Sequence, residues 1–450
     1  MNHSATASPL VGAPLLPTLT RLAIPGVFGA CIQSLLPVVE AWYLSSAGTI
    51  ALAAIAIVFP LIMLANMFSA GAIGGATSGA VARALGAGDL DRAASVLRSA
   101  VLIALIGGAL MGGLLLLVQS QLFALLGARQ EVLQAASAYA LIAFAGMPVI
   151  WLFNMLGSVL RGTGDMIRPA IGMLVNVLAY ALLAAWLIPS ANLPGYSMQA
   201  VMQAGASALI GAFAISTIVM LVFVLQPGQP VRMRGGWPRA EITVAILKPG
   251  LLAASQSFMT ITYALVATAL LGRLGVDWLA GYGLAVRLEL LMVPVIFGIG
   301  ASLIAIVGAH AGAGLRERAI QIAWRGTAAN VVAVGLIGAV FALAPQLWCG
   351  PLSSNAAVAA HCGQTLQILG PAYGFFALGL GLYFASQGLN TLIYPVAGAL
   401  VRLLLVATGL LWVSADTEPT IILWTLSGAM AVYGLFVAIC LKQFGWTIRS

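Results

Sequence analysis

Long apolar runs separated by short polar connections follow one another along the chain. A hydrocarbon core about 30 Å thick needs roughly 20 apolar residues for one helical crossing, and these runs have that length. They lack the alternation over about ten positions that a membrane β-barrel requires. The pattern predicts an all-α integral membrane protein with twelve transmembrane helices, at residues 19–44, 51–81, 95–118, 134–158, 167–188, 201–225, 246–271, 279–307, 319–344, 360–385, 392–413 and 420–441.

The composition excludes a water-soluble protein of this length. Of the 450 residues, 62% are hydrophobic and 7% are charged, and the mean hydropathy is +1.08. So few charges cannot cover a globule in water, whereas a bilayer supplies an apolar solvent. The net charge of +8 does not indicate a nucleic-acid partner, because the basic residues fall between the apolar runs and form no patch.

The positions of the basic residues predict the orientation of the chain. Of the 19 Lys and Arg residues, Arg129 and Arg273 fall in connections on one side, and Arg287 and Arg402 fall inside apolar runs. The others lie in or beside the alternate connections, so the positive-inside rule places both termini in the cytoplasm. We therefore expect a multi-pass protein of the cytoplasmic (inner) membrane of a prokaryote, and a monomer.

The sequence contains an internal repeat with an offset of 226 residues. The related residues are Gly86 and Gly312, Gly88 and Gly314, Arg92 and Arg318, Gly162 and Gly388, Pro169 and Pro395, and Gly172 and Gly398. Two units of six helices begin on the same side of the membrane, so the repeats are parallel and related by an axis along the membrane normal. Such bundles are usually transporters that hold the substrate between their halves.

The break between the halves is basic and contains three prolines, as expected of a linker. At the other end of the first half, residues 1–18 lack the basic start and cleavage site of a secretory signal. The predicted units are a cytoplasmic tail at 1–18, a six-helix lobe at 19–225, a cytoplasmic linker at 226–245, a second six-helix lobe at 246–441 and a cytoplasmic tail at 442–450.

Ordered motifs across nearly the whole chain resemble the multidrug and toxic compound extrusion (MATE) family, a V-shaped bundle of two lobes. In the first half they are Pro25-Gly26, residues 51–60, Arg83, residues 86–89, residues 161–165, Pro169 and Asn176. In the second half they are residues 280–283, Pro294, Gly298, residues 307–314, Gln387-Gly388 and Arg402. The resemblance implies a secondary antiporter, not an enzyme, that exports organic, often cationic compounds in exchange for protons or sodium ions.

Within the family the chain is most similar to the prokaryotic DinF-like branch, in which an acid in the first span and an Asn-x-x-x-Asp pattern in the fifth span build a cation site. Glu40 takes the position of the acid and Asn176 that of the asparagine, but Tyr180 stands where the aspartate is expected. A hard cation such as Na⁺ wants about six oxygen ligands that include carboxylates. One acid is sufficient for proton coupling, so we favour H⁺ as the coupling ion.

Glu40 is the predicted coupling residue, because an ionised carboxyl near the centre of a span costs roughly 2.5–3.5 kcal/mol and usually persists for function or pairing. The alternative is that Glu40 reaches the outer interface beside Trp42 and Tyr43. Pro37 removes a backbone hydrogen bond to the carbonyl of Gln33, so it is a predicted hinge next to the acid.

Asn176 and Tyr180 are four residues apart and share a helix face, so a site that contains one can contain the other. The alternative is that they are interhelical contacts, which commonly contribute around 0.6 kcal/mol without touching a ligand. The same two interpretations apply to the remaining candidate cavity-lining residues, which are Gln33, Asn66, Asn154 and Gln256.

Glu289 and Arg402 each lie about ten residues into their spans, so both are predicted near the membrane midplane. They form either a structural ion pair, with Arg287 as a competing partner for Glu289, or a second coupling site that opens during transport. Arg402 is the repeat equivalent of Asn176, so only the second half carries a cation at this position.

The sequence gives no indication of a metal site or a bound cofactor. The histidines His3, His310 and His361 are scattered, and no Gly-x-x-x-x-Gly-Lys-Ser/Thr pattern for ATP occurs. Cys349 and Cys362 flank a predicted outer connection, where a disulfide is open to them. The alternative functions are a flippase for a lipid-linked precursor, whose anionic headgroup would seek Arg287 and Arg402, and a Na⁺-coupled drug exporter.

Overall fold

The computed structural model describes residues 9–191, 197–233, 235–412 and 417–446, and every regular element in these ranges is helical. The start of the predicted first tail with His3, Arg234 of the linker, and the end of the last tail with Arg449 lie outside the described residues.

Each predicted span corresponds to one helix or to a chain of helices without a long break. The helices of the first half are α1 (Leu15–Ser45), α2 (Thr49–Asn66), the π-helical turn η1 (Met67–Ala72), α3 (Ile73–Gly86), α4 (Leu90–Leu125), α5 (Gln130–Ala145), α6 (Met147–Gly162), α7 (Ile167–Ala191) and α8 (Met198–Leu225). Those of the second half are α9 (Ala240–Gly272), α10 (Val276–Gly312), α11 (Arg316–Leu343), α12 (Gln346–Leu352), α13 (Ala356–Leu369), η2 (Gly370–Ala372), α14 (Tyr373–Leu389), α15 (Ile393–Trp412), α16 (Pro419–Cys440) and η3 (Leu441–Gly445).

Length and composition of the helices agree with the predicted fold class. Over the described ranges, ten helical stretches are long and apolar enough to cross a membrane, and α5 with α6 forms one further crossing that bends by 49°. A shorter apolar stretch covers residues 393–409 of α15. Several helices extend beyond the predicted spans, because helical hydrogen bonding continues past the apolar segment that lipid requires.

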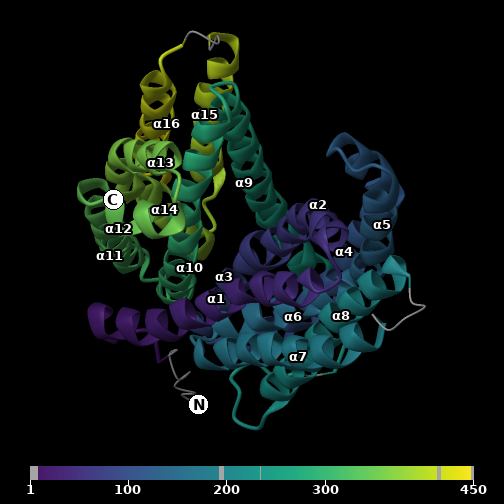
Figure 1. Cartoon of the computed structure of the whole chain (residues 1–450). Helices are drawn as coiled ribbons and strands as arrows, with labels where there is room; N and C mark the ends of the chain where they lie inside the picture. The colour runs from purple at the N-terminus through teal and green to yellow at the C-terminus, as the bar shows by residue number, and fades with distance from the viewer. Residues whose placement is uncertain (1–8, 192–196, 234, 413–416, 447–450) are drawn as a thin grey trace, which may run out of the picture.

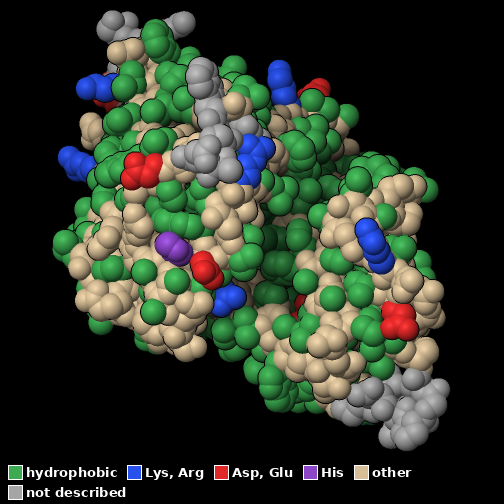
Figure 2. Space-filling model, turned by 45° about the horizontal axis from the view of Figure 1, so that its top comes forward, with side chains coloured by type: hydrophobic (Ala, Val, Ile, Leu, Met, Phe, Trp, Pro, Cys, Tyr) green, Lys and Arg blue, Asp and Glu red, His purple; other side chains and the backbone are tan. Residues whose placement is uncertain are grey.

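Two bundles of helices make up the molecule, and each has its own hydrophobic core (Figure 1). One core is built mainly from α2 to α8 and the other mainly from α9 to α16. Figure 2 shows a deep hollow between the two bundles, and the side chains on its visible walls are mainly hydrophobic.

The first helix of each half begins against the opposite bundle. In α1, Leu19 and Leu22 belong to the core of the second bundle, whereas Leu36 and Leu44 belong to that of the first. In α9, Ile246 belongs to the core of the first bundle. The start of α1 therefore packs against the second bundle, and the start of α9 packs against the first.

The bundles also meet directly where α3 and α10 end. A Cβ atom on Gly86 would overlap the carbonyl oxygen of Ala309, and a Cβ atom on Gly312 would overlap that of Arg83. The repeat offset relates Gly86 to Gly312 and Arg83 to Ala309. The two contacts are thus equivalent under the internal symmetry, as expected of parallel repeats.

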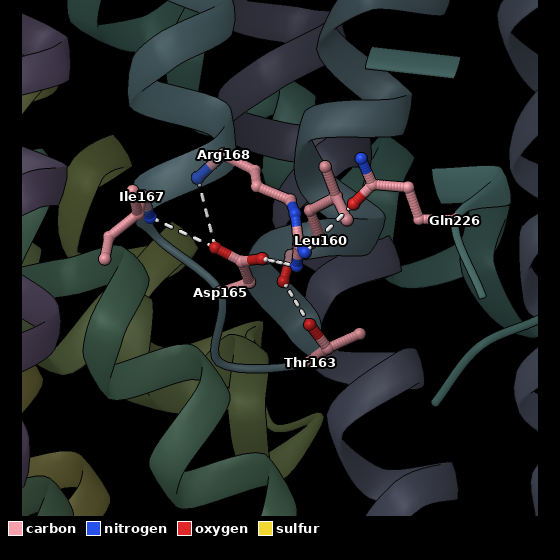
Figure 3. Close-up of polar contacts among 6 residues, drawn as sticks. All are labelled: Leu160, Thr163, Asp165, Ile167, Arg168 and Gln226. Atoms are coloured by element: carbon pink, nitrogen blue, oxygen red, sulfur yellow. Dashed lines mark hydrogen bonds and ion pairs between the residues drawn. The ribbon is translucent and has the colours of Figure 1, made fainter. Parts of the chain in front are cut away.

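Polar side chains fix the turn between α6 and α7 (Figure 3). The Asp165 carboxylate accepts hydrogen bonds from the backbone N–H groups of Ile167 and Arg168, at 3.2 and 3.1 Å, and forms a 2.6 Å salt bridge with the Arg168 guanidinium. Arg168 also donates to Gln226, at 3.0 Å. Asp165 is therefore a helix N-terminal cap, a common role for aspartate.

Cys349 and Cys362 form a disulfide bond, with their Cα atoms 5.9 Å apart. The bond joins the short helix α12 to α13. The sequence left it open whether these two cysteines form a disulfide, and the structure contains the bond.

Candidate transport site

Glu40 lies inside the first bundle and is 8% exposed. The Tyr139 hydroxyl on α5 donates a hydrogen bond to the Glu40 carboxyl, and Tyr180 on α7 interacts with it electrostatically. Trp42, two residues further along α1, is 69% exposed. Residues two apart on a helix face different directions, so α1 turns Trp42 outwards and Glu40 towards the tyrosines.

A further polar contact joins α1 to α7. The Gln33 side chain donates to the Asn176 carbonyl oxygen at 3.4 Å. Asn176 and Tyr180 are fully buried, and the Asn176 amide nitrogen and the Tyr180 hydroxyl have no hydrogen-bond partner among the described residues. The structure therefore brings together the candidates Gln33, Glu40, Asn176 and Tyr180 where α1 contacts α7. Helix α1 itself continues through Pro37 without a break.

Asn66 and Asn154 form a separate polar cluster in the same bundle. The Asn154 amide donates to the Asn66 carbonyl oxygen at 2.9 Å and to the Ser69 hydroxyl at 2.8 Å. Ser69 lies in the π-helical turn η1, where the altered helix geometry changes the direction of side chains. These hydrogen bonds fit a role as interhelical contacts.

Aromatic rings surround Arg402 in the second bundle. Its guanidinium carbon lies 3.7 Å from the ring centroid of Tyr263, 5.0 Å from that of Phe376 and 5.6 Å from that of Tyr433. Gln256, which is 3% exposed, donates to the Tyr433 hydroxyl at 3.1 Å. Three helices, α9, α14 and α16, thus supply an aromatic cage around the Arg402 cation of α15.

Glu289 interacts electrostatically with Arg402, but the two form no ion pair within 4.0 Å. Glu289 is only partly buried and has no hydrogen bond to another described residue. Arg287 is exposed and lies two residues before Glu289 on α10, so the two side chains do not face each other. Arg402 is therefore held by aromatic rings and not by its predicted partner Glu289, and Arg287 does not pair with Glu289 either.

Hydrogen bonds also cross between the bundles. The Arg83 guanidinium donates to the carbonyl oxygens of Gln387 and Gly388, at 2.9 and 2.8 Å, where α14 ends. The Gln387 amide donates to the carbonyl oxygen of Gly71 at 3.0 Å. Because the last carbonyls of a helix carry partial negative charge, they are suitable partners for the partly buried Arg83.

This arrangement can be compared with known proteins. The MatE family model matches residues 25–187 and 253–413, one match in each half of the chain. The chain belongs to the MatE family. MATE proteins are secondary transporters and not enzymes, so the chain is a multi-pass membrane transporter of the efflux type.

Curated MATE relatives are distant. A protein of Shewanella oneidensis named "FAD transporter" is 25% identical over 402 residues, which is 88% of this chain and 86% of that protein. The "Multidrug export protein MepA" of Staphylococcus saprophyticus is 26% identical over 288 residues, 62% of this chain and 61% of that protein.

Solved structures share the fold. A MATE crystal structure "in the bent conformation" has a TM-score of 0.87 and 21% identity, and covers 97% of this chain and 98% of its own. An "outward-facing conformation of a multidrug resistance MATE family transporter" has a TM-score of 0.84 and 20% identity, with 98% and 97% covered. The predicted MATE fold is therefore confirmed.

Sequence reasoning missed the tyrosines. Tyr139, Tyr263 and Tyr433 lie in apolar helices, where aromatic residues usually pack, and nothing in their neighbouring residues separates a hydrogen-bond donor from a packing residue. Arg83 appeared only as part of a family motif. An arginine at the end of the second apolar run, three residues before Gly86, is the sequence signal for this contact with α14.

Proposed function

We propose that this MATE transporter exports organic, cationic and amphipathic compounds across the cytoplasmic membrane in exchange for protons, and that Glu40 carries the proton. The names of the relatives range from FAD to multidrug export, so family membership leaves the substrate and the coupling ion open. The proposal therefore rests on the chemistry of the interior.

The burial of Glu40 without a cation is the observation that supports proton coupling. No Lys, Arg or His among the described residues forms an ion pair with its carboxyl, and its partners are phenols. An ionised carboxyl in an apolar interior is costly, and uptake of a proton removes that cost. The Tyr139 hydroxyl can remain bonded to the carboxyl in either state, because a hydroxyl is both donor and acceptor.

Sodium coupling receives less support from the same residues. Around Glu40 the described partners are phenols, and Tyr180 stands in place of a second carboxylate. Ions of this hardness prefer several oxygen ligands with carboxylates among them. One acid that binds and releases H⁺ is sufficient for exchange.

Transport follows by alternating access. With both termini in the cytoplasm, the contacts at Gly86 and Gly312 lie at the inner end of the bundles and the hollow of Figure 2 opens outwards. The protonated acid and the bound organic cation favour different arrangements of α1, so each ligand weakens the binding of the other. Proton entry from outside then promotes release of the compound.

The test is dye efflux from proteoliposomes that contain the purified protein. We expect an imposed pH gradient to drive ethidium export by the native protein, an imposed Na⁺ gradient to drive none, and Glu40→Gln to abolish the pH-driven export. Glu131→Gln is the matched control, because Glu131 is exposed at the start of α5. Undiminished export by Glu40→Gln would remove Glu40 from the mechanism, and Na⁺-driven export would replace the proton.

A further inference from the structure

We propose that the aromatic cage around Arg402 is a binding site for an organic oxyanion, a carboxylate, sulfonate or phosphate attached to an aromatic ring. The inference goes beyond the proposed export of cations, because it adds a class of anionic ligand. The oxyanion of such a ligand would bind the guanidinium in the second bundle, while Glu40 in the first bundle remains the proposed site of proton exchange.

Arg402 is buried and its guanidinium lies over aromatic rings. The side chain is 4% exposed, and its guanidinium carbon is 3.7 Å from the centre of the Tyr263 ring. Its N–H groups lie in the guanidinium plane, and no described residue accepts a hydrogen bond from them. A buried cation keeps several unused donors in this arrangement, and the planar fork matches an oxyanion.

Other unpartnered polar atoms lie around the same cation. The hydroxyls of Tyr263 and Tyr373 and the side-chain oxygen of Gln256 are buried and have no hydrogen-bond partner. Tyr263 interacts electrostatically with Arg402, and Tyr373 with Tyr263. The two phenols and the guanidinium can each donate a hydrogen bond to an oxyanion, whereas the Gln256 oxygen is an acceptor that an oxyanion does not satisfy.

Glu289 explains how the charge of Arg402 is balanced without this ligand. Its carboxyl is close enough to interact with Arg402 but forms no ion pair with it, and its side chain is partly exposed. An incoming oxyanion therefore competes with a distant carboxylate and not with a bidentate partner. Removal of the Glu289 charge should strengthen anion binding.

The aromatic side chains around Arg402 favour a ligand that itself contains an aromatic ring. The ring centroids of Phe376 and Tyr433 lie 5.0 and 5.6 Å from the guanidinium carbon of Arg402, further than that of Tyr263 at 3.7 Å. Aromatic pairs prefer centroid separations of about 4.5–7 Å, so a planar ligand can stack beside these rings while its charged group binds the guanidinium.

The test is equilibrium binding to the full-length protein in phosphatidylcholine nanodiscs. The probes are naphthalenesulfonate and its uncharged analogue naphthalenesulfonamide, which share the ring and differ in charge. We expect saturable binding of the sulfonate and at least about tenfold weaker binding of the sulfonamide, because hydrogen bonds to charged groups are the stronger ones.

Substitutions locate the site. Arg402→Gln should weaken sulfonate binding at least about tenfold and Arg402→Lys less, since lysine lacks the planar fork. Tyr263→Phe keeps the stacked ring and should weaken binding severalfold, which keeps the test informative if the Arg402 variants do not fold. Glu289→Gln should tighten binding. Arg325→Gln, at an exposed arginine on α11, is the matched control and should bind as the native protein does.

Three results would overturn the inference. They are sulfonate binding that is unchanged in Arg402→Gln and Tyr263→Phe, sulfonamide binding as tight as that of the sulfonate, and loss of sulfonate binding when phosphatidylglycerol is added to the nanodiscs, which would identify a lipid headgroup as the occupant. Ethidium export by the same preparation reports separately on the proposed function. Export without an Arg402-dependent anion site defeats only this inference, and an anion site without export defeats only the proposed function.

Discussion

Glu40 in the first bundle and Arg402 in the second are both buried and are opposite in charge. Each is less than a tenth exposed, each lies among aromatic side chains, and neither forms an ion pair with another described residue. Glu40 is bonded to a phenol hydroxyl, whereas Arg402 lies on phenyl and phenol faces. A carboxyl accepts hydrogen bonds and a guanidinium is attracted to ring faces, so the same residue type, tyrosine, serves both charges.

The difference indicates which features of a duplicated bundle can diverge. Gly162 packs on Ser78, and its repeat equivalent Gly388 packs on Ile304, because neither place leaves room for a side chain. The interior polar positions have no such restriction, and Asn176 in one bundle corresponds to Arg402 in the other. Close backbone contacts preserve the architecture, while the polar interior is free to take different ligands.

The same change in the two bundles should have unequal effects. Glu40→Gln should reduce pH-driven ethidium export to the level of protein-free liposomes, because no other acid among the described residues is as deeply buried. Glu289→Gln should lower export by less than about 5-fold. A full coupling free energy usually corresponds to about 5- to 150-fold. Initial rates of efflux after a pH jump measure both. Equal loss in the two variants would show that both bundles carry protons.

The contacts that the repeats share should be sensitive to any side chain. Gly312→Leu would drive a side chain into the Arg83 backbone, and overpacking of this kind costs about 1–3 kcal/mol or more. We expect a lower thermal unfolding temperature in detergent. Gly428→Leu is the control, because Gly428 is exposed and has open space beside it. Equal melting of the two variants would contradict the close crossing of α3 and α10.

The disulfide is a feature of the second bundle alone among the described residues, since Cys31 and Cys440 are unpaired. A loop of about 15 residues closed by a disulfide contributes roughly 3 kcal/mol in the chain-entropy description. Cys349→Ser with Cys362→Ser should therefore lower the unfolding temperature and leave ethidium export intact. Free thiols at both positions in the oxidised native protein, detected by mass spectrometry after alkylation, would contradict the bond.

The hydrogen bond to Glu40 should have the smallest effect. Tyr139→Phe keeps the ring in place and removes one hydroxyl, which is worth about 1 kcal/mol for a typical hydrogen bond. We expect pH-driven export to fall severalfold without being lost. Tyr394→Phe, at a partly exposed tyrosine of α15, controls for the loss of a hydroxyl. Full activity of Tyr139→Phe would mean that proton exchange at Glu40 does not depend on this hydrogen bond.

Much of the fold could be predicted because membrane crossing constrains the sequence directly. Apolar length predicted the helices, and the residues repeated at an offset of 226 predicted two parallel units. The π-helical turn at Met67–Ala72 and the bend between α5 and α6 could not be predicted with the same certainty, because both lie inside apolar runs. Only Pro148, at the start of α6, marked the bend.

The candidate site was less accessible to sequence reasoning. Glu40 and Arg402 stand out because charges are rare in apolar runs. Their partners do not, since a tyrosine in an apolar helix looks the same whether it donates a hydrogen bond or packs. The distance between Glu289 and Arg402 depends on how α10 and α15 sit in the bundle, so their positions along the spans left both interpretations open.

Proton release on substrate binding tests the central claim most directly. Ethidium is added to purified protein in a weakly buffered solution, and the change in pH is followed with an indicator dye. The account predicts that the native protein and Glu131→Gln release up to one proton per molecule and that Glu40→Gln releases none while still binding ethidium. Release by Glu40→Gln equal to that of the native protein would contradict the claim.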